Sequence, residues 1–317
     1  DNMSRVLGRN IYIKRDDMTG VSTGGNKVRK LEFLLADAKR QGAEIIFTTG
    51  GAQSNHAMLT AACAKKLGMT PILILKKRGV TERKGNQLLE YLMDTDVRFM
   101  DTDSYDDIYA EMDRVGQALG RPYYKIPCGG SNAIGALGYV NCMKEIADTG
   151  LHFDYVCCAE GSGGTHAGVA LGAKLFMPET QTIGLMVDSD PFDVITTHIM
   201  QETAKLLELD FVPTVEDVHL VDMCGPGYAI PLRRGQRRDT HDGRERGSVP
   251  RSGIHRQGLR GADKACARGE IQVHGQCPVP VLRRRGRSVC DRHRSGLSHE
   301  AAQIGAWEQK PCRRKGD

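Results

Sequence analysis

The sequence lacks any Cys-x-x-Cys pair, although it contains ten cysteines. A structural zinc site would be expected to contain such a pair. Disulfide frameworks are typical of small secreted proteins, which this chain does not resemble. Cys157 and Cys158 lie instead inside an apolar, strand-like run. We therefore expect reduced and buried thiols, no metal site, and a cytoplasmic protein.

Longer features are missing as well. No apolar run approaches the length of a membrane span, and we find neither an internal repeat nor a low-complexity linker. No spacing of paired carboxylates stands out. The sequence begins at Asp1 without an initiator methionine or a signal-peptide pattern, so we expect that its true N-terminus is missing.

What is present is typical of a globular protein. The length of 317 residues predicts about two domains, and 40% hydrophobic with 26% charged residues can form a buried core. The net charge of +5 would by itself hint at acidic partners. The excess arginine lies after Pro231, however, so the net charge is misleading for the residues before it.

Strands and helices alternate from residue 10 to about residue 222 with α/β spacing. We expect strands at residues 10–17, 44–49, 71–75, 97–100, 123–126, 155–159, 182–187 and 218–221. We expect helices at residues 28–40, 53–67, 85–93, 105–119, about 132–148 and 192–207. This pattern predicts a two-domain, three-layer α/β fold with mostly parallel open sheets.

The stretch Gly24-Gly25-Asn26-Lys27 gives the first indication of chemistry. The two glycines allow a tight turn, and Lys27 follows at the start of a helix, where unpaired amides favour anions. Desolvation and a positive helix end both lower the pKa of a lysine, and a neutral amine can form a Schiff base with an aldehyde. The alternative is a plain turn followed by a solvated, basic helix start.

A second loop, residues 161–165, lies between a strand and a helix. Its amides, its helix N-terminus and the hydroxyls of Ser162 and Thr165 suit one phosphate group. Neither the Walker pattern nor the dinucleotide pattern fits, so a lone monophosphate is favoured. The alternative is an ordinary tight turn, and we expect the neighbouring Glu160 and His166 to be structural.

A third loop also joins a strand to a helix and contains Ser54, Asn55 and His56. A hydroxyl, an amide and an imidazole together suit a substrate carboxylate and an aromatic hydroxyl. The alternative is a capped helix start, with Ser54 as the cap and His56 exposed. The three loops together require an aldehyde that carries one phosphate and a ring hydroxyl, and pyridoxal phosphate meets that requirement.

Four stretches carry a resemblance to a known family. Residues 24–33 and 50–56 resemble the D-cysteine desulfhydrase and 1-aminocyclopropane-1-carboxylate deaminase family. Residues 129–139 and 225–231 are more similar to the desulfhydrase branch. The resemblance runs from about residue 10 to Pro231, and it implies the tryptophan-synthase-β-like fold of pyridoxal-phosphate enzymes.

The resemblance also implies roles for individual residues. Lys27 would be the Schiff-base lysine and proton carrier, Asn55 would face the ring hydroxyl, and Tyr228 would line the pocket as a catalytic residue. Ser54, also expected to be catalytic, would bind the substrate carboxylate together with Asn55 and His56. The cofactor phosphate would be held by Lys30, Gly161, Ser162, Gly163, Gly164 and Thr165.

The pattern breaks after Pro231, where the family would continue with a Glu-Gly-Asn turn, then Asp-Pro-Val-Tyr-Thr-Gly-Lys-Ala, and later a glycine-rich Leu-Phe-Ala stretch. Codons chosen for residues 251–261 spell Asp-Pro-Val-Tyr-Thr-Gly-Lys-Ala-Phe-Ala when read one base later. The other two stretches appear in the same frame and order. We therefore expect residues 232–317 to be a frameshifted, non-native tail; the alternative is a basic tail for nucleic acid.

These observations predict a large domain from residues 1–29 and 136–231, a small domain from residues 30–135, and a cofactor in the cleft between them. The expected activity is elimination of sulfide from D-cysteine or a related β-substituted amino acid, impaired in this chain by the altered tail. Aminocyclopropane-carboxylate deaminase is the alternative reaction, and a non-catalytic nucleic-acid-binding protein is the alternative of another class. We expect a small amino-acid substrate, no nucleic-acid or membrane partner, and a homodimer, although no residue pattern gives the oligomeric state.

Overall fold

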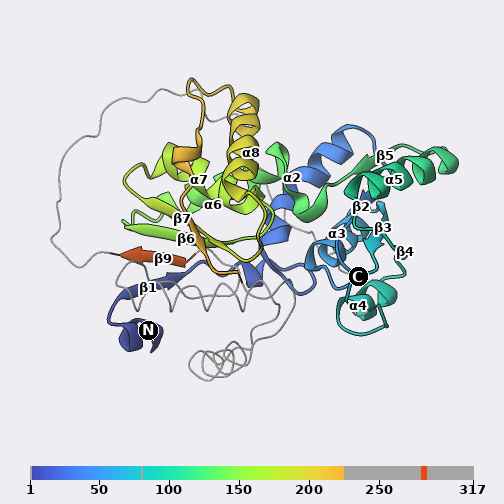
Figure 1. Cartoon of the computed structure of the whole chain (residues 1–317), viewed down its shortest axis with the longest axis horizontal. Coiled ribbons are helices and arrows are strands. Elements are labelled where there is room, and N and C mark those ends of the chain that lie inside the picture. The colour runs from blue at the N-terminus through green and yellow to red at the C-terminus, as the bar shows by residue number, and fades with distance from the viewer. Residues whose placement is uncertain (1, 80, 225–279, 284–317) are drawn as a thin grey trace, which may run out of the picture. The chain divides into compact units, whose positions relative to one another are not determined.

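The computed structural model describes residues 2–79, 81–224 and 280–283 (Figure 1). Within this part of the chain the strands form two sheets. The α/β fold with parallel strands that the sequence predicts is confirmed. None of the helices in the described ranges combines the length and the apolar character that a membrane crossing requires.

The first sheet has five strands in the order β1-β9-β6-β7-β8. Their bounds are Asn10–Ile13, Pro280–Arg283, Tyr155–Glu160, Gln181–Met186 and Leu220–Asp222. The neighbours β6, β7 and β8 are parallel, whereas β9 runs antiparallel to both β1 and β6. Three helices pack near this sheet, namely α6 (Ala133–Ala147), α7 (Gly164–Phe176) and α8 (Phe192–Leu206). One hydrophobic cluster joins α6 and α7 to β6, and a second joins all three helices to Leu220 of β8.

The second sheet has four parallel strands in the order β4-β3-β2-β5. Their bounds are Asp96–Met100, Thr70–Lys76, Ile45–Thr48 and Tyr123–Lys125. Side chains of α5 (Tyr105–Leu119) pack with Ile72 and Ile74 of β3, whereas those of α3 (Asn55–Lys66) pack with Leu73 and Leu75. Because alternate residues of a strand face opposite sides, β3 is covered on both faces, as its unbroken apolar run predicts.

The remaining helices connect or flank these layers. They are α1 (Asn2–Leu7), α2 (Asn26–Arg40), α4 (Asn86–Leu92) and three 3₁₀ turns at Asp16–Met18, Cys128–Gly130 and Val215–Asp217. Helix α5 has the predicted bounds, and Gly120 ends it in the left-handed conformation with φ of 61°. The first strand is shorter than predicted, because the chain turns at Asp16, and α1 was not predicted.

The domain boundaries proposed from the sequence stay a prediction. Strand β9 belongs to the segment that the sequence predicts to be non-native, and most of that segment lies outside the described residues. The frameshift hypothesis is therefore a matter for the nucleotide sequence of the gene.

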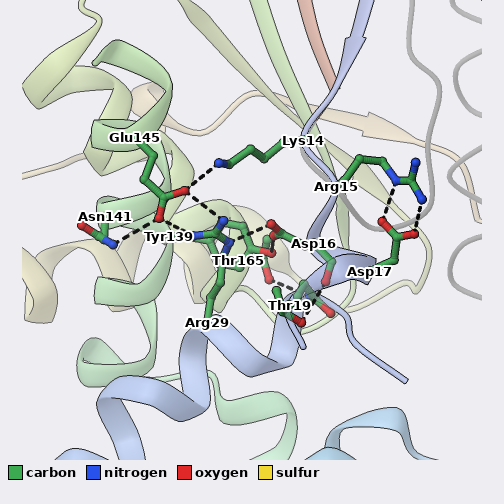
Figure 2. A network of polar contacts seen from close by, with 11 residues as sticks. Lys14, Arg15, Asp16, Asp17, Thr19, Arg29, Tyr139, Asn141, Glu145 and Thr165 are labelled. Atoms are coloured by element: carbon green, nitrogen blue, oxygen red, sulfur yellow. Dashed lines mark hydrogen bonds and ion pairs between the residues drawn. The ribbon is translucent and has the colours of Figure 1, made fainter. Parts of the chain in front are cut away.

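Helix α2 is held in place by a partly buried ionic network around Arg29 (Figure 2). The Arg29 guanidinium donates to Asp16 at 2.7 Å and to both carboxylate oxygens of Glu145 at 2.9 and 3.0 Å. Tyr139 donates to the other oxygen of Asp16 at 2.6 Å, and Lys14 pairs with Glu145 at 2.6 Å. The network joins α2 to the chain after β1 and to α6.

Arg29 and Glu145 each shift the pKa of the other so that both stay ionised. Burial alone would lower the pKa of Arg29, but its hydrogen bonds to Glu145 and the charge of Asp16 outweigh burial and raise that pKa. Burial alone would raise the pKa of Glu145, and the contacts with Arg29 and Lys14 lower it instead. Removing one member would leave a buried charge without its partner, which is costly.

We predict that Arg29→Met lowers the free energy of unfolding by about 3 kcal/mol, because Asp16 would stay buried without its cation. Arg15→Met is the matched control. Arg15 also pairs with an aspartate, Asp17, but its side chain is 52% exposed, so the expected loss is below about 1 kcal/mol. Urea unfolding of the two variants measures both values, and equal losses would contradict the assigned importance of Arg29.

A buried carboxyl on α4 marks a second electrostatic feature. Glu90 has no exposed surface, and neither of its carboxylate oxygens has a hydrogen-bond partner among the described residues. Burial raises the pKa of Glu90 to about 8. The folded chain therefore holds a proton on Glu90 that the unfolded chain releases near the ordinary carboxyl pKa of about 4.3.

This difference predicts a pH-dependent stability. A carboxyl with a raised folded pKa contributes fully below its unfolded pKa, and the contribution is lost as the pH rises toward 8. The wild type should therefore lose roughly 3 kcal/mol of unfolding free energy, relative to Glu90→Gln, as the pH rises from 5 to 8. The exposed Glu82→Gln is the control, and a wild-type-minus-variant difference that does not change with pH would refute the raised pKa.

Candidate active site

The turn before α2 places Lys27 in the first turn of the helix. Gly24 and Gly25 have φ of 64° and 131°, and a Cβ on Gly24 would overlap the Asp17 carbonyl oxygen. The Gly25 amide donates to the Asp16 carbonyl at 2.7 Å. These constraints start the helix at Asn26, two residues earlier than predicted, and leave Lys27 half-buried as its second residue.

Lys30 lies three residues after Lys27, on the same side of α2, and is completely buried. Its Nζ donates to the Gly129 carbonyl at 3.2 Å and to Ser131 Oγ at 3.1 Å. Buried cations need polar partners. The partners found here come from the turn before α6, which the sequence had not connected with this lysine.

The glycine loop between β6 and α7 is tightly packed. Gly163 has φ of 81°, and a Cβ there would come within 2.8 Å of Ile195. A Cβ on Gly164 would come within 2.8 Å of Ser131 Cα. The Gly163 amide donates to Glu160 at 2.7 Å, and Glu160 also contacts His166 at 3.0 Å. Glu160 and His166 thus support the loop from within, as expected from the sequence.

The lysine turn and the glycine loop lie next to each other in the structure, although they are far apart in the sequence. Asn26 Nδ2 donates to Thr165 Oγ1 at 3.1 Å across a sequence separation of 139 residues. Ser131 makes the second link, because its Oγ accepts from Lys30, accepts from the Gly164 amide at 3.3 Å, and donates to Ser162 at 2.9 Å. The amides at the α7 N-terminus and a buried ammonium therefore share one neighbourhood, which suits an anion.

The third loop begins α3 at the C-terminal end of β2. Ser54 is the N-cap, and its Oγ accepts from the Ala57 amide at 3.2 Å. Asn55 is exposed and accepts from Asn86 at 2.8 Å. The expected alternative of a capped helix start is therefore correct for Ser54 but wrong for His56, which is only 3% exposed.

His56 lies within electrostatic reach of both lysines. Burial is the main cause that lowers its pKa well below the ordinary value, and the charges of Lys27 and Lys30 add to the effect. The Pro127 carbonyl acts in the opposite direction and is outweighed. His56 is accordingly neutral at ordinary pH, and its ring lies near enough to the lysine turn to be affected by the charges of both lysines.

Sequence reasoning missed the role of Ser131 in this site. The sequence offered Ser131 or Asn132 as the cap of α6. Asn132 is the cap and accepts from the Gly135 amide at 2.8 Å, whereas Ser131 contacts Lys30. The only available signal was the position of Ser131 after two glycines. Tyr228, the remaining predicted site residue, lies outside the described part of the chain.

Comparison with known proteins places this geometry in context. A family model described as pyridoxal-phosphate dependent enzyme matches residues 1–235. A solved structure of an ACC deaminase homologue is 33% identical, with a TM-score of 0.77 over 87% of this chain and 84% of that chain.

Two further solved structures show the same fold at lower identity. The processed form of threonine deaminase isoform 2 from Solanum lycopersicum is 18% identical, with a TM-score of 0.60 over 85% of this chain and 74% of that one. A hydrogen-sulfide-producing enzyme from Fusobacterium nucleatum is 14% identical, with a TM-score of 0.53 over 80% of each chain.

The residues present fit the cofactor that this family uses. A phosphate needs several donors in a confined space, and the loop packed against Ser131 offers amides, hydroxyls and the nearby Lys30 ammonium. An aldehyde needs an amine, and Lys27 lies one helical turn from Lys30. The buried ammonium beside tightly packed glycines is the observation on which this fit rests.

We predict that Lys30→Met weakens the binding of pyridoxal phosphate at least about tenfold, because a charged hydrogen-bond donor to the phosphate is lost. Lys39→Met, an exposed substitution on the same helix, should leave the affinity unchanged. Absorbance titration with the cofactor measures both. An unchanged affinity in Lys30→Met would remove Lys30 from the phosphate site.

Proposed function

The chain belongs to the family of pyridoxal-phosphate-dependent enzymes, and from this premise we propose that it is a carbon–sulfur lyase acting on D-cysteine or a related β-substituted amino acid. The observation that supports a catalytic site most directly is the contact between the lysine turn and the glycine loop. The choice of substrate rests on residues 129–139 and 225–231, which resemble the desulfhydrase branch.

We propose the following division of roles in holding the cofactor. Lys27 is its covalent anchor, and Asn55 faces the ring hydroxyl. Lys30 binds the phosphate together with Gly161, Ser162, Gly163, Gly164 and Thr165. When bound, pyridoxal phosphate supplies an electron sink for the bond changes at the substrate α-carbon.

The substrate carboxylate would meet the N-terminus of α3. Ser54 Oγ already accepts from the Ala57 amide, so the first main-chain amides of the helix, those of Asn55 and His56, are the donors without a partner inside the helix. They would hold the carboxylate beside Lys27. Ser54 then acts by fixing the helix start, and Tyr228 would line the same pocket.

The proposed reaction needs one proton carrier and one leaving group. The substrate amine would displace Lys27 from the cofactor aldehyde. The freed Lys27 Nζ would then take the proton from the substrate α-carbon, and the bond between Cβ and sulfur would break with departure of sulfide. Addition of water then gives pyruvate and ammonia. Closely packed glycines around the site exclude water while the cofactor is held.

Ring opening of 1-aminocyclopropane-1-carboxylate is the second candidate. It is favoured by the 33% identity to a structure of an ACC deaminase homologue. Both reactions need the same lysine, phosphate site and carboxylate site. The residues that would distinguish them fall largely after Pro231, outside the described ranges.

Several features of the proposed enzyme rest on the sequence alone. They are a homodimer, a small domain of residues 30–135, and impaired activity of this chain because of its altered tail. A cytoplasmic location is a further proposal, and it is supported by free and buried thiols at Cys63, Cys142, Cys157 and Cys158.

A direct test combines an adduct measurement with product assays. Borohydride reduction of the cofactor-loaded chain should attach the adduct mass to the peptide that contains Lys27, and Lys27→Ala should lose it while Lys39→Ala keeps it. The chain should release little sulfide from D-cysteine, and a gene shifted by one base after codon 231 should restore release. Lys27→Ala in the restored chain should lower the rate by roughly 10³-fold.

The possible results separate the proposals. 2-Oxobutyrate from 1-aminocyclopropane-1-carboxylate, with no sulfide from D-cysteine, would replace the first candidate by the second. Ordinary turnover by the chain with its present tail would refute the impairment. An adduct on a lysine other than Lys27 would refute the assigned anchor.

A further inference from the structure

The hydroxyl of Thr48, the last residue of β2, makes two buried hydrogen bonds that the proposed function does not explain. Thr48 has no exposed surface, so its hydroxyl must be satisfied within the protein. Its Oγ1 donates to the Ile126 carbonyl at 2.9 Å and lies 2.8 Å from His56 Nε2. The sequence gave no reason to connect Thr48 with the chemistry.

Counting protons fixes the direction of these two hydrogen bonds. A hydroxyl has one proton to donate, and a carbonyl oxygen can only accept. The Thr48 proton is therefore used by Ile126, and the hydroxyl oxygen must accept from His56 Nε2. A neutral imidazole has a single N–H, so Nδ1 carries a lone pair and is an acceptor.

The surroundings of His56 keep the ring in this neutral form. The ring is 97% buried, given its 3% exposure, and the positive groups acting on it are Lys27 and Lys30 from α2. A Cβ on Gly130 would lie 3.4 Å from His56 Cε1, so the turn before α6 also packs against the ring. Protonation of His56 would place a third cation in this space.

The Pro127 carbonyl lies near the ring and favours its protonated form. It makes no hydrogen bond of acceptable geometry with Nδ1, which has no hydrogen-bond partner among the residues that the structure describes. A buried polar atom without a partner is uncommon in folded proteins, and a catalytic or ligand-binding role is one explanation for it. The atom belongs to the residue whose own main-chain amide is proposed to bind the carboxylate, and the charge of Lys27 reaches its ring. An unsatisfied acceptor here calls for a donor.

We propose that Thr48 is a positioning residue that fixes His56 as a neutral hydrogen-bond acceptor toward the bound ligand. His56 then binds a group that carries a proton, such as the ammonium or the thiol of an amino acid, and its side chain does not bind a carboxylate. This inference rests on the proposed function for the identity of the ligand, but not for the state of the ring. It refines the sequence-based role of His56, because the carboxylate contact passes to the main-chain amide.

The state of the ring can be measured without turnover. Nitrogen-15 NMR of the full chain with labelled histidine distinguishes protonated from unprotonated ring nitrogens, and His56→Asn identifies the His56 signals. We expect a protonated Nε2 and an unprotonated Nδ1 from pH 5.5 to pH 8.5. A protonated Nδ1, or titration of the ring within that range, would overturn the proposal, and the wild-type protein is sufficient for this measurement.

Two substitutions test the role of Thr48. Thr48→Val has nearly the same shape but no hydroxyl, so the ring should lose its single protonation pattern and show a mixture or the reverse form. Thr48→Ser keeps the hydroxyl and should restore the wild-type pattern. An unchanged pattern in Thr48→Val would show that another group orients His56.

Acetate serves as a probe for the carboxylate. Its addition to the full chain should leave both ring-nitrogen signals of His56 unchanged, whereas proton transfer to Nδ1 on acetate binding would refute the acceptor role. If the ring has the expected form but no lyase activity is found, the proposed reaction fails and the assignment of Thr48 stands. If lyase activity is found and Nδ1 is protonated, the proposed reaction stands and the assignment of Thr48 fails.

Discussion

The position of α2 depends on the ion pairs that the partly buried Arg29 makes with two carboxylates, of which Asp16 is buried. The guanidinium bonds Asp16, which follows β1, and both oxygens of Glu145 on α6. Breaking such a pair costs several kcal/mol, because an uncompensated charge would remain in the interior. The network therefore fixes the start of α2 relative to both neighbours, and the two lysines of that helix take their places from it.

Hydrogen bonds and close packing then connect α2 to the proposed ligand site. Lys30 reaches Ser131, and Ser131 in turn contacts the glycine loop through Ser162 and Gly164. Side chains larger than hydrogen at Gly163 and Gly164 would overlap their neighbours. Donors from α2, from the turn before α6 and from α7 are thus brought together by packing, while the second sheet contributes the start of α3.

Local patterns predicted most of the regular structure, and distant contacts explain what they missed. The bounds of α5 and the buried β3 follow from propensity, apolar runs and Gly120. The first strand is followed by a turn in which Asp16 bonds Arg29, a partner 13 residues away. Of the two cap candidates before α6, Asn132 is the cap, whereas the partners of Ser131 lie on α2 and α7. The burial of His56 depends on Thr48 and Gly130, which no local pattern reveals.

Gly138 of α6 shows how much of this arrangement depends on a residue without functional groups. A Cβ at this position would overlap the carbonyl oxygen and carbon of Arg29, both of them backbone atoms that cannot rotate away. Even alanine would therefore push α2 from α6 and shift both lysines together. A survey of inactivating mutations should find that this glycine tolerates substitution as poorly as the lysines do, although it is not proposed to contact the cofactor or the substrate.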